Sequence, residues 1–173
     1  GASVKNAGFA CFGSPSELLH DIETESEVAA LHRVEERWRG LVELRETLGD
    51  AAIGFEAVGG YELFGKDSPL YTRVAERFDA LNAALHGIFG KNVFTWADQR
   101  IPALGLNADH LVWNPLEGAV DSGKLMRALL AKVQGEGVEV RFSSSVEGWE
   151  EKPDGVELHV ADVGTVKAAQ AVI

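Results

Sequence analysis

The sequence predicts a mixed α/β (α+β) protein that combines long amphipathic helices with short strands. Three observations favour this class. Apolar residues recur at three- and four-residue steps in residues 24–48 and 68–90, the period of a helix with one buried face. Short apolar runs between turn residues in residues 138–173 are typical of neighbouring strands. Of the 173 residues, 46% are hydrophobic, which is enough to form the core of an ordinary domain.

Four helices are expected, and each has a capping signal at its start. In a capping box, a Ser or Thr side chain and a Glu three residues later bond to each other's backbone N–H groups. The helices are expected over residues 15–22, 24–48, 68–90 and 122–135. Their starting signals are Ser14 with Glu17, Thr24 with Glu27, Ser68 before Pro69, and Asp121 or Ser122. Gly49 stands where a helix ends in a left-handed residue, and Gly135 and Gly137 are expected to end the last helix.

The strands are expected to be short. Residues 52–65 alternate around Gly59-Gly60, a pair suited to a tight turn, and so predict a β-hairpin. Further strands are expected over residues 93–96, 110–113, 138–142, 156–160 and 165–173, with turns at 153–155 and 162–164. The last strands suggest an antiparallel meander inserted in an α/β layer.

Charge and cysteine content exclude several kinds of partner. The net charge of −11 argues against nucleic acid and anionic membranes, because both require a basic surface. There is no apolar run long enough to span a bilayer and no signal peptide, so a cytoplasmic protein is expected. Cysteine and histidine content argue against a metal site. The single Cys11 permits no intrachain disulfide or cysteine metal cluster and is expected to be a small buried residue. The five histidines are widely spaced, so no metal site is predicted.

Motifs alone identify no catalytic residue. The sequence has no P-loop, HExxH or GxSxG pattern. Gly135-Glu136-Gly137 begins like a dinucleotide-binding loop but follows a helix and precedes a strand, which is the reverse of the required order. We interpret these glycines as a helix end.

Three segments carry a family resemblance. Ser3-Val4-Lys5-Asn6-Ala7-Gly8 resembles the run Ser-(Thr/Gly)-(Arg/Lys)-Asn-(Ala/Gly)-Gly of FAD-dependent oxidoreductases of the D-amino-acid oxidase and glycine oxidase type. Residues 117–151 resemble the family pattern Gly-x-(Val/Ile)-Asp, helix, Gly-Val, strand and valine. Residues 165–173 are similar to the strand that leads into the family's Ala-Thr-(Asn/Gly)-Gly loop. The resemblance covers most of the chain in the family's order.

The resemblance implies an enzyme that uses FAD to oxidise an amine or amino acid by hydride transfer to the flavin. The residues that it places against the ribityl chain and isoalloxazine ring are Ser3, Lys5, Asn6, Ala7 and Gly8. Lys5 would bring positive charge near the reduced ring. The backbone of Val146 would pair with adenine.

The family's N-terminal strand–GxGxxG–helix unit does not occur in this sequence. We therefore expect residues 1–173 to be one central fragment, inactive by itself and binding FAD weakly or not at all. Residues 1–22 would form a flavin-contacting loop and short helix, residues 23–117 a helical and hairpin region on the substrate side, and residues 118–173 part of the FAD-domain sheet. Exposed edges predict a homodimer. Two alternatives remain open: a 2-hydroxy-acid dehydrogenase of the same fold and a non-catalytic interaction domain.

Overall fold

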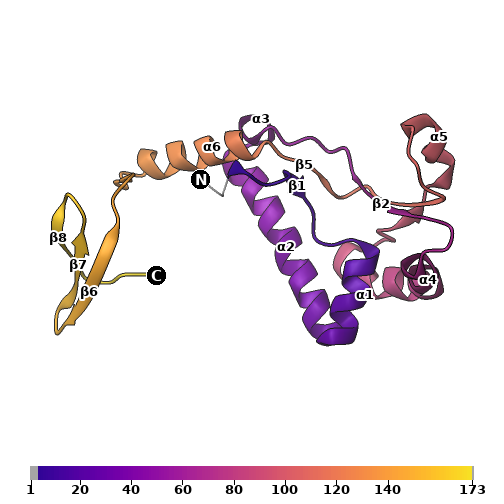
Figure 1. Ribbon diagram of the computed structural model, residues 1–173, viewed down its shortest axis with the longest axis horizontal. Coiled ribbons are helices and arrows are strands. Elements are labelled where there is room, and N and C mark those ends of the chain that lie inside the picture. Colours follow the sequence, from indigo (N-terminus) through magenta and orange to yellow (C-terminus); the bar gives the residue numbers. More distant parts are fainter. Residues whose placement is uncertain (1–3, 173) are drawn as a thin grey trace. The chain divides into compact units, whose positions relative to one another are not determined.

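The computed structural model describes residues 4–172, and the chain divides into two compact units. The first unit extends to Lys132 and the second begins at Val133. The chain combines helices with antiparallel strands (Figure 1), which confirms the predicted mixed α/β class. Among the described residues, no helix combines the length and apolar character needed to cross a membrane.

Three helices form most of the core of the first unit. α1 (Pro15–Thr24) and α2 (Glu27–Leu48) lie side by side as a helical pair (Figure 1), and α1 also contacts α4 (Pro69–Phe89). The buried residues of α4 recur at helical spacing: Val74, Phe78, Leu81, Asn82 and Leu85. α4 therefore contributes more buried residues than any other helix among the described residues, on the face that its sequence period predicts.

A three-stranded antiparallel sheet packs with these helices. Its order is β2 (Gly60–Phe64), β4 (His110–Asn114) and β3 (Thr95–Trp96), so β4 is central. The short helices η2 (Asp98–Arg100) and α5 (Ile101–Leu104) connect β3 to β4. Phe64 and Val112 are buried in the core, and Trp96 stacks on Phe78 of α4 with ring centroids 4.7 Å apart.

Asn82 is a buried polar residue that fixes the chain before β3. Its Oδ1 accepts hydrogen bonds from the N–H groups of Val93 and Phe94, both at 2.9 Å. Its Nδ2 donates to the Phe94 carbonyl at 3.1 Å. These three bonds satisfy backbone groups that burial would otherwise leave unpaired.

The hairpin predicted over residues 52–65 is wrong. α3 (Asp50–Ile53) occupies its first part, and β2 pairs with β4 instead of with a neighbouring strand. Gly59 and Gly60 have close neighbours: an added Cβ would lie 2.3 Å from Trp113 Nε1 at Gly59 and 2.1 Å from Glu117 Oε2 at Gly60. The glycine pair therefore marks a place where other residues approach closely. From the local sequence alone, this role of a glycine pair looks the same as a turn.

The capping residues are partly as predicted. The box formed by Ser14 and Glu17 is confirmed, with the Ser14 N–H donating to Glu17 Oε2 at 3.0 Å. The cap predicted at Thr24 is wrong: Ser26 Oγ caps α2 by accepting from the Ala29 N–H, whereas Thr24 Oγ1 donates to the His20 carbonyl. α1 continues to Thr24, so the start of α2 moves to the next available cap.

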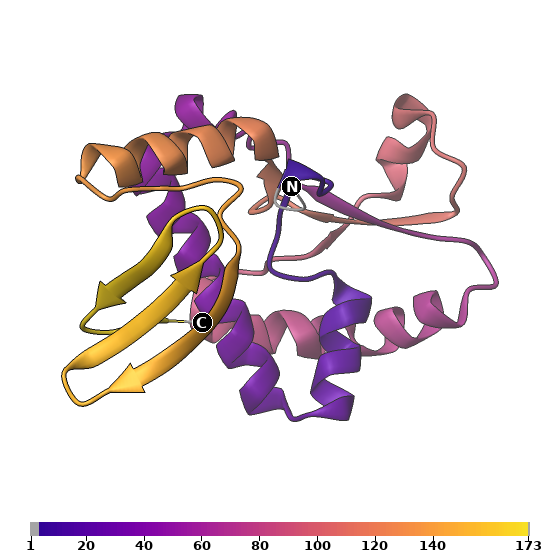
Figure 2. The same cartoon turned by 60° about the vertical axis from the view of Figure 1, so that its left-hand side comes forward.

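α6 (Ser122–Gly135) is the last helix, and the Asp121 carboxylate caps it by accepting from the Lys124 N–H at 2.9 Å. In the second unit, β6 (Val146–Lys152), β7 (Gly155–Val160) and β8 (Gly164–Ala168) form the predicted antiparallel meander (Figure 2). The strand predicted over residues 138–142 is not formed. Among the described residues no strand pairs with this segment, and alternating apolar and polar residues do not stabilise a strand that has no partner.

Candidate functional site

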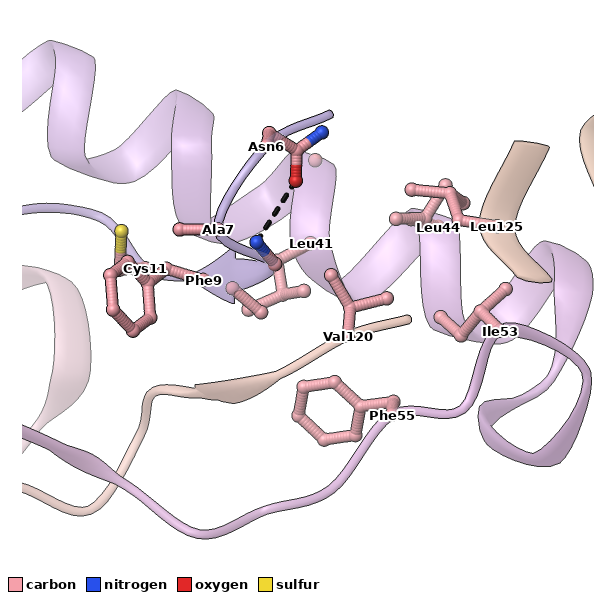
Figure 3. Close-up of a pocket in the computed structure, with 13 residues that line it drawn as sticks. Asn6, Ala7, Phe9, Cys11, Leu41, Leu44, Ile53, Phe55, Val120 and Leu125 are labelled. Atoms are coloured by element: carbon pink, nitrogen blue, oxygen red, sulfur yellow. Dashed lines mark hydrogen bonds between the residues drawn. The ribbon is translucent and has the colours of Figure 1, made fainter. Parts of the chain in front are cut away.

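A cavity of about 500 Å³ lies in the first unit (Figure 3). Its volume is within the range typical of small-molecule sites. The N-terminal segment lines it with Asn6, Ala7, Gly8, Phe9, Ala10 and Cys11. The other lining residues are Gly40, Leu41 and Leu44 of α2, Ile53 of α3, and Phe55, Val120 and Leu125. The lining is mostly apolar, so it suits a ligand with a broad apolar surface.

A short strand pair brings distant parts of the chain to this cavity. β1 (Phe9–Ala10) pairs antiparallel with β5 (Gly118–Ala119), and the Val120 N–H donates to the Gly8 carbonyl at 2.7 Å. The two segments are far apart in the sequence, yet they carry two of the three family-like motifs. The fold therefore joins these motifs in one place.

Gly8 holds the turn in the N-terminal segment. Its φ is +71°, a conformation that glycine accepts without steric cost, and its N–H donates to Asn6 Oδ1 at 2.9 Å (Figure 3). A Cβ at this position would lie 2.3 Å from the Val120 carbonyl oxygen. The backbone can therefore approach residue 120 closely only because residue 8 has no side chain.

Gly40 opens the opposite side of the cavity. It lies in the interior of α2, where glycine costs about 1 kcal/mol relative to alanine. No heavy atom lies within 4 Å of a Cβ built on it, so packing within the described chain does not require a glycine there. Leu41 and Leu44 extend from the same helix toward the cavity (Figure 3). The missing side chain leaves room for a ligand.

The predicted cofactor-binding residues divide into three groups. Asn6, Ala7 and Gly8 line the cavity together. Lys5 is exposed and does not line the cavity, and Val146 begins β6 in the second unit, 54% exposed and paired with Val160. Ser3 lies outside the described residues. Contact of any of these residues with FAD stays a prediction.

Sequence reasoning missed much of the cavity. The apolar period of residues 24–48 predicts one buried face, but Leu41, which lies in this segment, is only partly buried and lines the cavity. The signal that could have indicated this was Gly40, a glycine in the middle of an otherwise regular helix. Phe55 and Val120 carry no comparable local signal, because only the tertiary fold brings them here.

Cys11 is exposed, which corrects the expectation that it is buried. Partial desolvation of its sulfur, followed by the nearby charges of Glu117 and Glu17, raises the pKa of the thiol. The thiolate is the reactive form, so these surroundings disfavour redox chemistry at Cys11. Within residues 4–172, no three His, Cys, Asp or Glu side chains converge to hold a metal ion.

Glu117 is a partly buried carboxylate next to the N-terminal segment. Burial raises its pKa to about 7, opposed by the backbone N–H groups of Phe12 and Gly13. The Asn114 amide lies close enough to oppose the rise as well, although its Nδ2 does not reach hydrogen-bond geometry. The carboxylate accepts from the Phe12 N–H at 3.3 Å. It is thus a titratable group near neutrality that contacts the segment lining the cavity.

Comparison with known proteins identifies the family. The family model described as FAD dependent oxidoreductase (DAO) matches residues 1–173. The chain belongs to this FAD-dependent oxidoreductase family. The family resemblance seen in the sequence is thereby confirmed. No curated protein is significantly similar to the chain.

Solved structures of low sequence identity share the fold. Glycine oxidase from Bacillus cereus ATCC 14579 has a TM-score of 0.64 at 16% identity, covering 97% of this chain and 44% of that one. Iminodiacetate oxidase from Chelativorans sp. BNC1 has a TM-score of 0.65 at 19% identity, covering 96% and 43%. L-proline dehydrogenase from P. horikoshii has a TM-score of 0.57 at 16% identity, covering 81% and 38%. The chain of this FAD-dependent oxidoreductase spans less than half the length of these proteins.

The cavity residues of this FAD-dependent oxidoreductase fit a flavin ring system. Isoalloxazine presents two flat apolar faces, and the lining offers apolar side chains together with the small residues Ala7 and Gly8. Gly40 supplies free space where other residues would carry a side chain. The residues that could hold the ring are therefore those of the N-terminal segment and the facing part of α2.

Proposed function

We propose that the intact protein oxidises an amine or amino acid and that the cavity described here holds part of the flavin. The observation that carries this proposal is the β1–β5 pairing, which brings two family-like segments to one apolar cavity of suitable volume. Two proteins of similar fold are a glycine oxidase and an iminodiacetate oxidase, and their names support an amino-acid or amine substrate.

When bound, FAD supplies the hydride acceptor for a C–H bond beside nitrogen. The residues of this chain would provide position and surroundings. Gly8 allows close backbone approach, and Asn6 fixes that turn through its bond to the Gly8 N–H. Leu41, Leu44 and Val120 would exclude water from one side of the ring, which strengthens polar interactions at its edges.

We also propose a division of roles along the chain. Residues 1–22 would contact the flavin, and residues 118–173 would complete part of the FAD domain. Residues 23–117 would lie on the substrate side, except for those that line the cavity. Ser3 and Lys5 would extend the contact made by residues 6–8, with Val146 near the adenine. Each of these roles can be tested by alanine substitution in the holoenzyme and measurement of FAD affinity.

The site is tested by filling the cavity. Gly40→Leu in the holoenzyme is expected to weaken FAD binding by at least tenfold, because the added side chain occupies space intended for the ring. Gly87→Leu is the matched control, since Gly87 also lies inside a helix with no heavy atom within 4 Å of an added Cβ. Equal FAD affinity of both variants and the wild type, measured by fluorescence titration, would contradict the proposed site.

The reaction is tested separately. The holoenzyme is mixed anaerobically with amino acids, amines or 2-hydroxy acids, and bleaching of the visible flavin band is followed. Amino acids or amines are expected to reduce the flavin. Reduction by 2-hydroxy acids alone would overturn the proposed substrate class while leaving the site intact.

A further inference from the structure

Phe12 anchors the end of the segment that lines the cavity. Its side chain is 1% exposed and stacks on Phe89 of α4 with ring centroids 5.0 Å apart. It also meets the edge of Trp38 of α2 at 6.2 Å. These aromatic contacts anchor the Phe12 side chain in the core.

Charged side chains hold both sides of the Phe12 backbone. The Phe12 N–H donates to Glu117 Oε1 at 3.3 Å, and Arg37 Nη1 donates to the Phe12 carbonyl at 3.2 Å. Glu117 lies between β4 and β5, and Arg37 lies on α2. We refer to these two bonds as the Glu117–Phe12–Arg37 contact. This contact links the N-terminal segment to the connection between β4 and β5 and to α2.

The Glu117 carboxylate continues the pairing of β1 with β5. Backbone register runs from Phe9↔Ala119 to Ala10↔Gly118, and Glu117 is the residue that directly precedes β5. Its side chain then accepts the Phe12 N–H, so the tie extends two residues beyond the ladder. Gly60 leaves space for this carboxylate, because a Cβ there would lie 2.1 Å from Glu117 Oε2.

We propose that Glu117 and Arg37 are positioning residues, which fix the Phe12 backbone and through β1 set the place of the Asn6–Gly8 wall of the cavity. The importance of that wall for the cofactor rests on the proposed function. The two residues themselves act through Phe12, since neither lines the cavity.

Ionisation of Glu117 supplies a readout specific to this contact. The titratable and charged groups around it are Cys11, Glu17 of α1, Arg37 of α2, and Tyr61 and Glu62 of β2. A carboxyl whose pKa is raised by burial returns to its ordinary value when the segment opens to water. The open form then binds fewer protons, so opening is favoured as pH rises from about 5 to 8.

The test uses hydrogen exchange on this chain without flavin, followed in peptides that cover residues 6–13. After correction for intrinsic exchange, wild-type protection is expected to fall with rising pH. Glu117→Gln keeps an acceptor and removes the titration, so its protection is expected to be independent of pH. Glu117→Ala and Arg37→Ala are expected to lower protection about tenfold at pH 6, the size expected for loss of one hydrogen bond.

Glu43→Gln is the charge-matched control, because Glu43 is exposed on α2. It is expected to exchange like the wild type. Unchanged protection in Glu117→Ala and Arg37→Ala, or the same pH dependence in Glu117→Gln and wild type, would overturn the positioning role whether or not the cavity binds flavin.

FAD affinity of the holoenzyme separates the two proposals. Glu117→Ala and Arg37→Ala are expected to weaken FAD binding by about three- to tenfold. If Gly40→Leu weakens binding and these two variants do not, the positioning inference fails and the site stands. If none of the three changes affinity, the proposed site itself fails, and the exchange result alone decides whether the contact orders the segment.

Discussion

α4 and α6 have similar sequence patterns and opposite environments. Both carry apolar residues at helical spacing, yet α4 buries five residues and α6 buries none. α4 packs against α1 and the sheet, where Phe78 stacks on Trp96. In α6, Leu125 lines the cavity and Leu129 is only partly buried. An apolar face therefore predicts that a helix packs against something, but it does not identify the partner.

The same contrast occurs within α2. Ala30 and Val34, in its first half, are buried, whereas Gly40, Leu41 and Leu44 line the cavity. One continuous apolar face thus packs in the core at one end and lines the cavity at the other. Core and site are distinguished by what lies across from the helix, a property of the tertiary structure.

The largest expected effect is a loss of stability on truncation of a buried leucine in α4, compared with a leucine in α6. Leu85→Ala removes a side chain with 0% exposure and is expected to lower the free energy of unfolding by about 3 kcal/mol, because it loses buried area and leaves a cavity. Leu129→Ala in α6 is expected to cost less than about 1 kcal/mol, because its side chain is already partly in water. Urea denaturation measures both, and equal losses would contradict the contrast between α4 and α6.

A smaller effect is expected at Glu117, between the core and the cavity. Its pKa is about 7 in the folded chain and near the ordinary value of 4.5 when unfolded, so the folded chain binds more protons between these values. The stabilisation is fully present below about pH 4.5 and is lost as pH rises through 7. About 2.5 pKa units at about 1.4 kcal/mol each correspond to about 3.5 kcal/mol, and solvent screening of the partly buried carboxyl reduces the expected loss to about 2 kcal/mol.

Glu117→Gln isolates this contribution from other titrating groups. The difference in unfolding free energy between wild type and variant is expected to shift by about 2 kcal/mol from pH 5 to pH 8, with the wild type relatively less stable at high pH. If the difference in unfolding free energy stays constant with pH, the Glu117 carboxyl is solvated in the folded chain and is not buried with the core.

The smallest expected effect sharpens the distinction between core and site. Gly40→Ala and Gly87→Ala are both expected to stabilise the chain by about 0.5–1 kcal/mol, because each replaces a helix glycine that has free space around it. Only Gly40→Ala is expected to weaken FAD binding in the holoenzyme, by about threefold. Thermal unfolding with FAD titration measures both, and parallel behaviour of the two variants in both assays would argue against a cavity role for Gly40.

Local chemistry made several parts of the fold predictable. The Ser14–Glu17 cap, the length of α4 and the turns of the β6–β7–β8 meander depend on residues close in sequence. The wrong predictions concern residues whose structure depends on contacts with distant parts of the chain. The Gly59-Gly60 pair was interpreted as a turn, but it accommodates Trp113 and Glu117. Residues 138–142 alternate, but no strand within residues 4–172 pairs with them.

The sequence by itself determined the mixed α/β class, most helix boundaries and the family, because periodicity, caps and motifs are local properties. It also identified Asn6, Ala7 and Gly8 as a unit. Only the tertiary structure decided that these residues face α2 across a cavity and that Glu117 and Arg37 hold the backbone of Phe12. The physical reason is that strand pairing and cavity walls join residues far apart in the chain, and periodicity shows that a surface is apolar without showing what it meets.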